Sequence, residues 1–187
     1  MKKIPTMFVR DWSGDRSRVV DVPHPDCGWV FAGEGWPTIK FDGTCCMVRA
    51  GVLFRRRELK SGQRAPFGFE SEGTDPETGK TVGWVPVGDG PEDRWHREAF
   101  DWLDPKEDGT YELIGPHIQG NPESNHREEL VNHQDGDWVI RERVPRDFDG
   151  LRVWLSGRDI EGIVWHHADG RMAKIKLRDF GLKRGSA

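Results

Sequence analysis

Glycine and proline interrupt this sequence so often that no long helix can form in it. The 187 residues include 23 Gly and 12 Pro, and both residue types break regular structure when they fall inside a helix or strand. Nine Trp and nine Phe still supply bulky side chains for a core. We therefore expect a loop-rich α+β protein with more strand than helix, organised as one domain over residues 1–187.

Strand-like stretches separated by turn residues predict two β-hairpins, the first of them within residues 38–57, which read as a hairpin or a meander. The first pairs strands at 44–48 and 52–54. The second pairs strands at 161–167 and 172–180 across a turn that contains Asp169-Gly170, a dipeptide favoured in tight hairpin turns. Because side chains alternate along a strand, the second hairpin should separate a polar face from a core face.

Helical patterns are short. The best candidate covers 91–103, with a proline in its first turn, and a second covers 148–155 with Asp147 as its cap. A strand is expected at 29–32 and a surface turn at 71–81. The residues expected to share one face of the first helix are Trp95, Ala99, Trp102 and Leu103.

Charge is distributed unevenly along the chain. The net charge of −4 argues against a protein that coats nucleic acid by electrostatic attraction. Residues 171–184 nevertheless contain six Lys or Arg and one Asp, and Arg55-Arg56-Arg57 form a second basic cluster, whereas residues 91–129 are acidic. This pattern suits a phosphate-bearing substrate that must also be released.

The sequence contains three cysteines, and Cys45 and Cys46 are adjacent. Adjacent strand residues point to opposite faces, which argues against a shared zinc site, and three cysteines do not form a disulfide framework. With no long apolar run and no signal-like start, we expect no transmembrane helix and a cytoplasmic location.

Four short motifs follow one another in a characteristic order. In order they resemble motifs I, III, IV and V of the covalent nucleotidyltransferases, which comprise DNA ligases, RNA ligases and mRNA capping enzymes. The four motifs are Lys40-Phe41-Asp42-Gly43, Glu112-Leu113-Ile114-Gly115, Glu161-Gly162-Ile163-Val164 and Lys174-Ile175-Lys176.

The second hairpin has its own physical interpretation. Lys174, Lys176 and Arg178 should share one strand face, while Ile175 and Leu177 enter a core. On the partner strand, Glu161 and Ile163 should share a face, with Gly162 between them allowing close backbone approach. Two lysines beside a carboxylate can neutralise phosphate oxygens and help to hold Mg²⁺.

Longer segments narrow the resemblance. Residues 40–46, 112–122 and 161–166 are similar to the family that contains the vertebrate 5′–3′ RNA ligase and its bacterial and viral relatives. The resemblance implies an α+β nucleotidyltransferase fold, an ATP-grasp-like ligase core with two antiparallel sheets, flanking helices and an ATP groove between the sheets. No C-terminal OB-fold or other accessory domain is expected, which favours RNA ligases over DNA ligases and capping enzymes.

The resemblance also implies a mechanism. Lys40 attacks ATP to give a lysyl–AMP intermediate, AMP passes to a 5′-phosphate on RNA, and the 3′-hydroxyl of a second end displaces it. An ordinary lysine has a pKa near 10.4, so the Lys40 amine needs cationic neighbours and partial burial to become reactive. Lys174 and Lys176 would be catalytic too, with Mg²⁺, or Mn²⁺ in its place, as the cofactor.

Further roles follow from the same resemblance. Lys40, Lys174 and Lys176 would contact ATP, Glu112 would bind the ribose hydroxyls, and either Arg55 or Arg56 would contact phosphate. Glu161 and Asp42 would bind metal. Two roles remain unassigned: either Trp138 or Phe148 would stack on the adenine, and His117 is a candidate for substrate contact. His166 and His167 fit structural roles better.

Two other functions remain open from the sequence. In the first alternative, the chain adenylylates a different acceptor, such as a DNA end or a protein. In the second, it is a non-catalytic RNA-binding module that has kept the fold. The presence of all four motifs argues against the second alternative.

Overall fold

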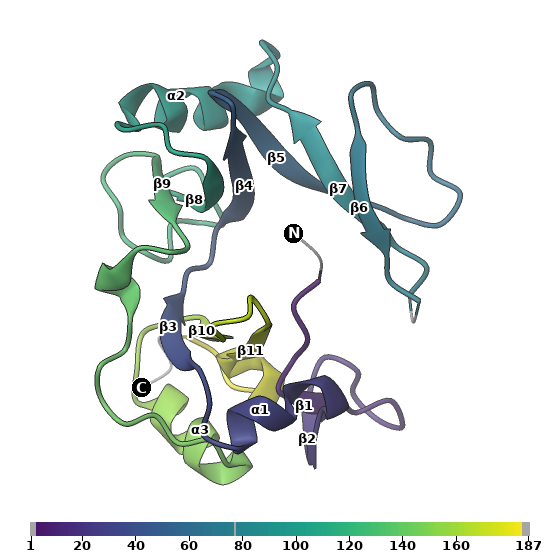
Figure 1. The fold of residues 1–187 in the computed structure, drawn as a ribbon, viewed down its shortest axis with the longest axis vertical. Coiled ribbons are helices and arrows are strands. Elements are labelled where there is room, and N and C mark those ends of the chain that lie inside the picture. The colour runs from purple at the N-terminus through teal and green to yellow at the C-terminus, as the bar shows by residue number, and fades with distance from the viewer. Residues whose placement is uncertain (1–2, 77, 185–187) are drawn as a thin grey trace. The chain divides into compact units, whose positions relative to one another are not determined.

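A computed structural model of the protein describes residues 3–76 and 78–184. The chain folds as two compact units. Unit 1 takes in Lys3 and residues 42–135, and unit 2 takes in residues 4–41 together with the chain from 136 onward. The chain therefore leaves unit 2 directly after Phe41, at the end of β3 (Trp36–Lys40), and returns to it at Gly136 (Figure 1).

Unit 1 contains a six-stranded antiparallel sheet in the order β6-β7-β5-β4-β8-β9. The predicted first hairpin is confirmed as β4 and β5. The predicted surface turn at 71–81 is wrong in its first half, because residues 71–74 pair with β7 as an edge strand. The strands are β4 (Thr44–Arg49), β5 (Val52–Leu59), β6 (Glu70–Thr74), β7 (Thr81–Pro86), β8 (Gly109–Ile114) and β9 (Glu129–Asn132).

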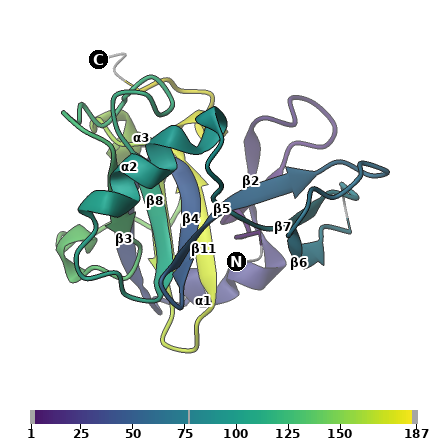
Figure 2. The same cartoon turned by 90° about the horizontal axis from the view of Figure 1, so that it is seen from above.

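One helix covers a face of this sheet. A 3₁₀ turn at Pro91–Asp93 leads into α2 (Arg94–Trp102), which confirms the predicted helix and lies across β4 and β8 in Figure 2. Ala99 packs against a core that includes Cys46. Trp102 was expected on the same buried face but is 66% exposed. It is the last residue of α2, and its ring lies against the guanidinium of Arg127, 5.7 Å from the ring centroid.

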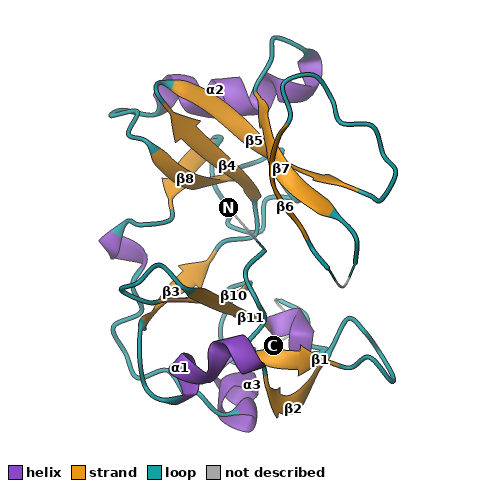
Figure 3. Cartoon of the chain, turned by 45° about the vertical axis from the view of Figure 1, so that its right-hand side comes forward, coloured by secondary structure: helices purple, strands orange, loops and turns teal. Residues whose placement is uncertain are grey.

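Unit 2 is built around a three-stranded antiparallel sheet in the order β11-β10-β3, drawn in Figure 3. Its core cluster includes Ile163, Ile175 and Leu151. The elements are β1 (Phe8–Arg10), β2 (Val19–Pro23), α1 (Gly28–Phe31), β3 (Trp36–Lys40), α3 (Phe148–Ser156), β10 (Gly162–His166) and β11 (Met172–Lys176).

The short helix expected at 148–155 is confirmed as α3. The Asp147 side chain accepts a hydrogen bond from the backbone N–H of Gly150, as an N-cap should. The strand expected at 29–32 is wrong, since α1 occupies residues 29–31 and Ala32 is its C-cap. Trp29 and Val30 are adjacent and both buried, a pattern that a helix against a core permits and a one-sided strand does not.

The second hairpin is confirmed as β10 and β11, but its last strand is shorter than expected. After Lys176 the chain turns into a 3₁₀ helix, Leu177–Phe180. The Asp179 carboxylate accepts the backbone N–H of Lys176 at 2.8 Å, and Gly181 ends the turn at φ 75°. Side chain–backbone bonding of this kind competes with continuation of a strand.

The fold class is therefore α+β, as expected. The described residues form three antiparallel sheets rather than two, since β1 and β2 pair separately. Within the described part of the chain, no helix has the length and apolar character that a membrane crossing needs.

Candidate functional site

Candidate site residues of unit 2 lie in one row across three strands. Gly162, at the start of the central strand β10, pairs with Lys40 of β3 on one side and with Lys176 of β11 on the other. Paired residues in neighbouring strands point to the same face of a sheet. The two lysines therefore flank a position that has no side chain of its own.

Glu161 joins the two lysines. Its Oε1 lies 2.5 Å from Nζ of Lys176 and its Oε2 lies 2.6 Å from Nζ of Lys40. Lys40 Nζ also donates to the carbonyl oxygen of Phe41 at 3.0 Å. The structure thus brings together three of the residues predicted from the sequence.

The predicted face of Glu161 is wrong. It was expected to share a strand face with Ile163, yet Ile163 is fully buried in the core while Glu161 contacts the lysines. Glu161 precedes β10, which begins at Gly162, so its side chain is not bound by the alternation within the strand.

Gly162 is required by close packing. A Cβ atom at this position would lie 2.2 Å from the carbonyl oxygen of Ile175 and 2.8 Å from Cα of Lys176. The missing side chain therefore allows β11 to approach β10 and holds Lys176 close to Glu161.

Charge and burial set the protonation of this group. Burial raises the pKa of Glu161, but the ammonium groups of Lys40 and Lys176 outweigh it and hold the pKa below its usual value. Burial, followed by the positive charge of Lys40, lowers the pKa of Lys176, against the opposing effect of Glu161. The group is a compact cationic site built around one carboxylate.

Lys174 lies one row further along β11. It pairs with Val164. Lys174 shares a strand face with Lys176, because Ile175 between the two lysines and Ala173 before them are fully buried on the other face. The predicted face is confirmed for Lys174 and Lys176 and is wrong for Arg178, which lies beyond β11 in the 3₁₀ helix. The backbone of Lys174 is also fixed by hydrogen bonds to Pro5 and Met7, which extends the sheet beyond β11.

In unit 1, Glu112 of β8 lies opposite Cys45 of β4. Its Oε1 accepts the backbone N–H of Gly43 at 3.2 Å, and its Oε2 lies 3.1 Å from Nε2 of His133. The glutamate is 8% exposed. Two residues of separate motifs, Gly43 and Glu112, are thus in direct contact, and sequence reasoning missed His133.

Asp42 precedes Gly43 in the same segment. Its backbone N–H donates to Oε1 of Glu123 at 3.0 Å. Sequence reasoning missed Glu123 as well. In the structure, the loop that carries it has an unusual backbone. Gln119, Asn121 and Ser124 all have positive φ, which non-glycine residues adopt infrequently.

The structure distinguishes the two candidate arginines. Arg55 forms an ion pair with the buried carboxylate of Asp93, with Nε and Oδ1 2.7 Å apart, and it points to the sheet face that α2 covers. Arg56 is the next residue of β5 and points to the opposite face, the face of Glu112. Arg56 is therefore the better candidate for nucleotide contact.

The two candidate stacking residues also differ. Phe148 packs edge-on against Phe8 and Phe180 in the core of unit 2. Trp138 packs edge-on against Phe41, the residue after Lys40, with ring centroids 4.8 Å apart. Trp138 remains the candidate for adenine stacking, whereas Phe148 has a structural role.

Asp42 and Glu161, the predicted metal ligands, belong to different units. Among residues 3–76 and 78–184, no three His, Cys, Asp or Glu residues are grouped as a metal site would require. Both oxygens of Glu161 are engaged by lysines. A single carboxylate fits a Mg²⁺ ion that takes its other ligands from substrate phosphates, so metal binding by these residues stays a prediction.

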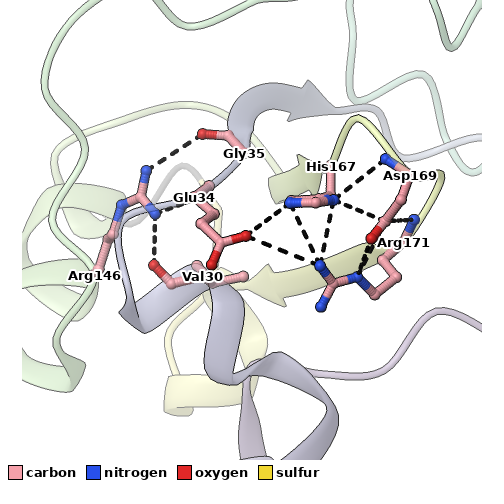
Figure 4. Close-up of polar contacts among 7 residues, drawn as sticks. All are labelled: Val30, Glu34, Gly35, Arg146, His167, Asp169 and Arg171. Atoms are coloured by element: carbon pink, nitrogen blue, oxygen red, sulfur yellow. Dashed lines mark hydrogen bonds and ion pairs between the residues drawn. The ribbon is translucent and has the colours of Figure 1, made fainter.

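The three other histidines considered from the sequence, His117, His166 and His167, have protein partners. His167 lies 2.8 Å from Glu34 and 2.7 Å from Asp169, in the polar cluster that Figure 4 shows beside Arg146 and its three backbone acceptors. His166 bonds to Thr38 at 3.0 Å. His117 is held by buried Glu128 at 2.7 Å, and its contact with substrate stays a prediction.

One family model and three curated relatives match part of this chain. The family model described as RNA ligase 1 matches residues 102–187, slightly less than half of the sequence. RNA ligase 1 of Rattus norvegicus is 34% identical over 79 residues, that of Pongo abelii 35% over 81, and that of Danio rerio 38% over 85.

These alignments cover 39–40% of this chain and 24–25% of the relatives. The chain thus spans about a quarter of the length of the curated relatives that it matches. The family-model match includes Glu112, Glu161, Lys174 and Lys176 but begins after Lys40, Asp42 and both arginines. The comparisons support a relationship to the RNA ligase 1 family over residues 102–187.

Proposed function

We propose that this chain carries the catalytic site of an ATP-dependent RNA ligase that works through a lysyl–AMP intermediate on Lys40. One observation carries the proposal: Lys40 and Lys176 flank Gly162, and Glu161 joins them at 2.6 and 2.5 Å. Similarity of residues 102–187 to RNA ligase 1 supports RNA as the substrate.

In the first step, the neutral amine of Lys40 attacks the α-phosphorus of ATP. A nitrogen–phosphorus bond forms, and the bond to the pyrophosphate oxygen breaks. Lys176, and Lys174 one row away, would stabilise the negative charge that builds on the phosphate oxygens. A Mg²⁺ ion that arrives with the triphosphate would neutralise further charge, with Glu161 as its protein ligand.

Lys40 must lose its contact with Glu161 before it reacts. A carboxylate 2.6 Å away favours the ammonium form, which has no lone pair for attack. Binding of metal by Glu161 would remove this stabilisation and leave Lys40 beside the positive charge of Lys176. In this way nucleotide binding would itself activate the nucleophile.

In the remaining steps, the 5′-phosphate of one RNA end takes AMP from Lys40, and the 3′-hydroxyl of a second end attacks that phosphate and releases AMP. Arg56 and Glu112 would bind the nucleotide, as phosphate and ribose contacts. The alternative is that Lys40 passes AMP to a DNA end or to a protein, and the two possibilities differ only in the acceptor.

A mass measurement tests the first step. Incubation with ATP and Mg²⁺ should add one AMP to the protein through an acid-labile bond at Lys40. Lys40→Ala and Lys40→Arg should both lack the adduct, because guanidinium stays protonated and is a poor nucleophile. Lys60→Arg, at an exposed lysine of unit 1, is the matched control and should react normally. An adduct in either Lys40 variant would refute the proposal.

A further inference from the structure

The only hydrogen-bond acceptors on a carboxylate are its two oxygens, which together accept about four hydrogen bonds. On Glu112, Oε1 already receives the N–H of Gly43 and Oε2 lies 3.1 Å from Nε2 of His133. The Glu112 side chain is 11% exposed, so its remaining acceptor positions are restricted in direction. Whatever holds the carboxylate plane in place also decides where a ligand hydroxyl can donate.

His133 holds that plane, and its own orientation is fixed twice. Its Nδ1 lies 3.0 Å from the hydroxyl of Thr110, and its backbone N–H donates to the carbonyl oxygen of Thr110 at 3.0 Å. Because a carboxylate only accepts, Nε2 must donate to Glu112, and in the tautomer with its proton on Nε2 the Nδ1 atom accepts from the Thr110 hydroxyl. The chain of donors runs from Thr110 through His133 to Glu112.

We propose that His133 is a positioning residue that makes Glu112 selective for the vicinal hydroxyls of a ribonucleotide. The inference rests on the proposed function, since it assumes that Glu112 faces the ribose of ATP. The orientation set by His133 presents acceptors that require hydroxyl donors, so a sugar without its 2′-hydroxyl leaves part of a buried carboxylate unpaired. That penalty is how a polar site rejects a deoxy analogue.

The experiment compares ATP with 2′-deoxy-ATP. Both kcat/KM for Lys40 adenylylation and the equilibrium dissociation constant are measured for each nucleotide. The wild type should prefer ATP by about tenfold or more, the scale of a hydrogen bond to a charged group. His133→Ala should reduce this preference about tenfold, through weaker binding of ATP and with 2′-deoxy-ATP nearly unaffected.

Two further variants separate positioning from general stability. His133→Gln places an amide donor near Glu112 and should restore much of the preference. His126→Ala removes an exposed histidine of the same unit and should leave the preference unchanged. A purely structural role would change the melting temperature without changing the ratio between the two nucleotides.

The outcomes distinguish this inference from the proposed function. A wild type that forms no lysyl–AMP but binds ATP more tightly than 2′-deoxy-ATP, with the preference lost in His133→Ala, refutes the reaction and supports His133. A folded His133→Ala protein with an unchanged ratio overturns the inference while leaving the reaction intact. Equal binding of the two nucleotides by the wild type also overturns it.

Discussion

The Nζ atom of Lys40 lies 2.6 Å from Oε2 of Glu161. The proposed nucleophile and the proposed metal ligand are thus partners of one another, and each must give up this contact to do its work. The same carboxylate also binds Lys176. Changes at Glu161 should therefore affect both stability and reaction rate, and the two effects can be measured separately.

The pH dependence of stability tests the charge state of Glu161. Burial raises the pKa of Glu161, but Lys40 and Lys176 hold it below the ordinary 4.5. A carboxyl with a lowered folded-state pKa stabilises the fold above its unfolded pKa, and the contribution is lost as pH falls through the folded pKa. The wild type should therefore exceed Glu161→Gln in stability at neutral pH, with a difference that shrinks below about pH 4.5. Urea unfolding across this range measures it, and a constant difference would contradict the assignment.

Lys176 and Ile175 are neighbours on opposite faces of β11. Replacing Lys176 should therefore mainly lower the reaction rate, whereas replacing Ile175 should mainly lower the stability. Lys176→Ala should slow adenylylation about a hundredfold or more, the scale of losing a major electrostatic contact in a transition state, and it should destabilise the fold less than Ile175→Ala does, because Glu161 keeps Lys40 as a partner. Ile175→Ala should cost about 2–5 kcal/mol of unfolding free energy by leaving a core cavity. Single-turnover rates and denaturant titrations decide the matter. Unfolding caused by Lys176→Ala alone would reverse the assigned faces.

Arg55 and Arg56 should separate in the same manner. Arg56→Ala should weaken ATP binding without changing the melting temperature. Arg55→Ala should cost about 1–3 kcal/mol of stability, because it leaves the buried carboxylate of Asp93 without its ion-pair partner. Calorimetric ATP titration and thermal unfolding of both variants provide the measurement. Loss of ATP binding in Arg55→Ala at full stability would exchange the two roles.

Gly162→Ala should damage the lysine row by steric pressure. The new Cβ would lie 2.2 Å from the carbonyl oxygen of Ile175, so β10 and β11 would have to separate, at a cost of about 1–3 kcal/mol and with a loss of adenylylation. Gly157→Ala is the matched control, since a Cβ atom at that position would meet nothing closer than the carbonyl oxygen of Trp154, 4.0 Å away. Equal stability of the two variants would show that the close approach is dispensable.

RNA specificity should depend on the 3′-terminal sugar of the acceptor. Proteins distinguish RNA from DNA largely through the 2′-hydroxyl, and this hydroxyl lies beside the attacking oxygen. Pre-adenylylated oligonucleotides that differ only in a 3′-terminal ribose or deoxyribose should be sealed well and poorly, respectively. Sealing should also fall steeply as salt rises, because the protein has a net charge of −4 and binds phosphate through local cations. Equal sealing of both ends would refute the RNA assignment and leave the lysyl–AMP chemistry untouched.

The lysine face of β11 was predictable because the information is local. The alternation from Ala173 to Lys176 and the nearby partner strand fall within one short stretch, so the period of two identifies the polar face directly. The same reasoning failed after Lys176, where the Asp179 carboxylate replaces a strand partner. It failed at Trp29 and Val30 because packing of both side chains overrode their strand propensity.

The other site features depend on contacts that sequence pattern does not contain. The choice between Arg55 and Arg56 follows from which sheet face α2 covers, and that is decided by packing far along the chain. His133 and Glu123 lie in segments without periodicity, and only the structure shows that they reach Glu112 and the backbone of Asp42. The partnership of Lys40 with Glu161 likewise required the register of β3 against β10.

The path of the chain through the two units has a consequence for synthesis. Residues 42–135 of unit 1 are inserted between the two segments of unit 2, so on the ribosome the sequence of unit 1 is complete before β10 and β11 have been made. Domains generally fold as they emerge, and all six strands of the unit 1 sheet have been synthesised at that stage. Lys40 precedes residues 42–135, whereas Glu161 and Lys176 follow them. While unit 1 is being made, the nascent chain therefore carries the proposed nucleophile without either of its two partners at the proposed site.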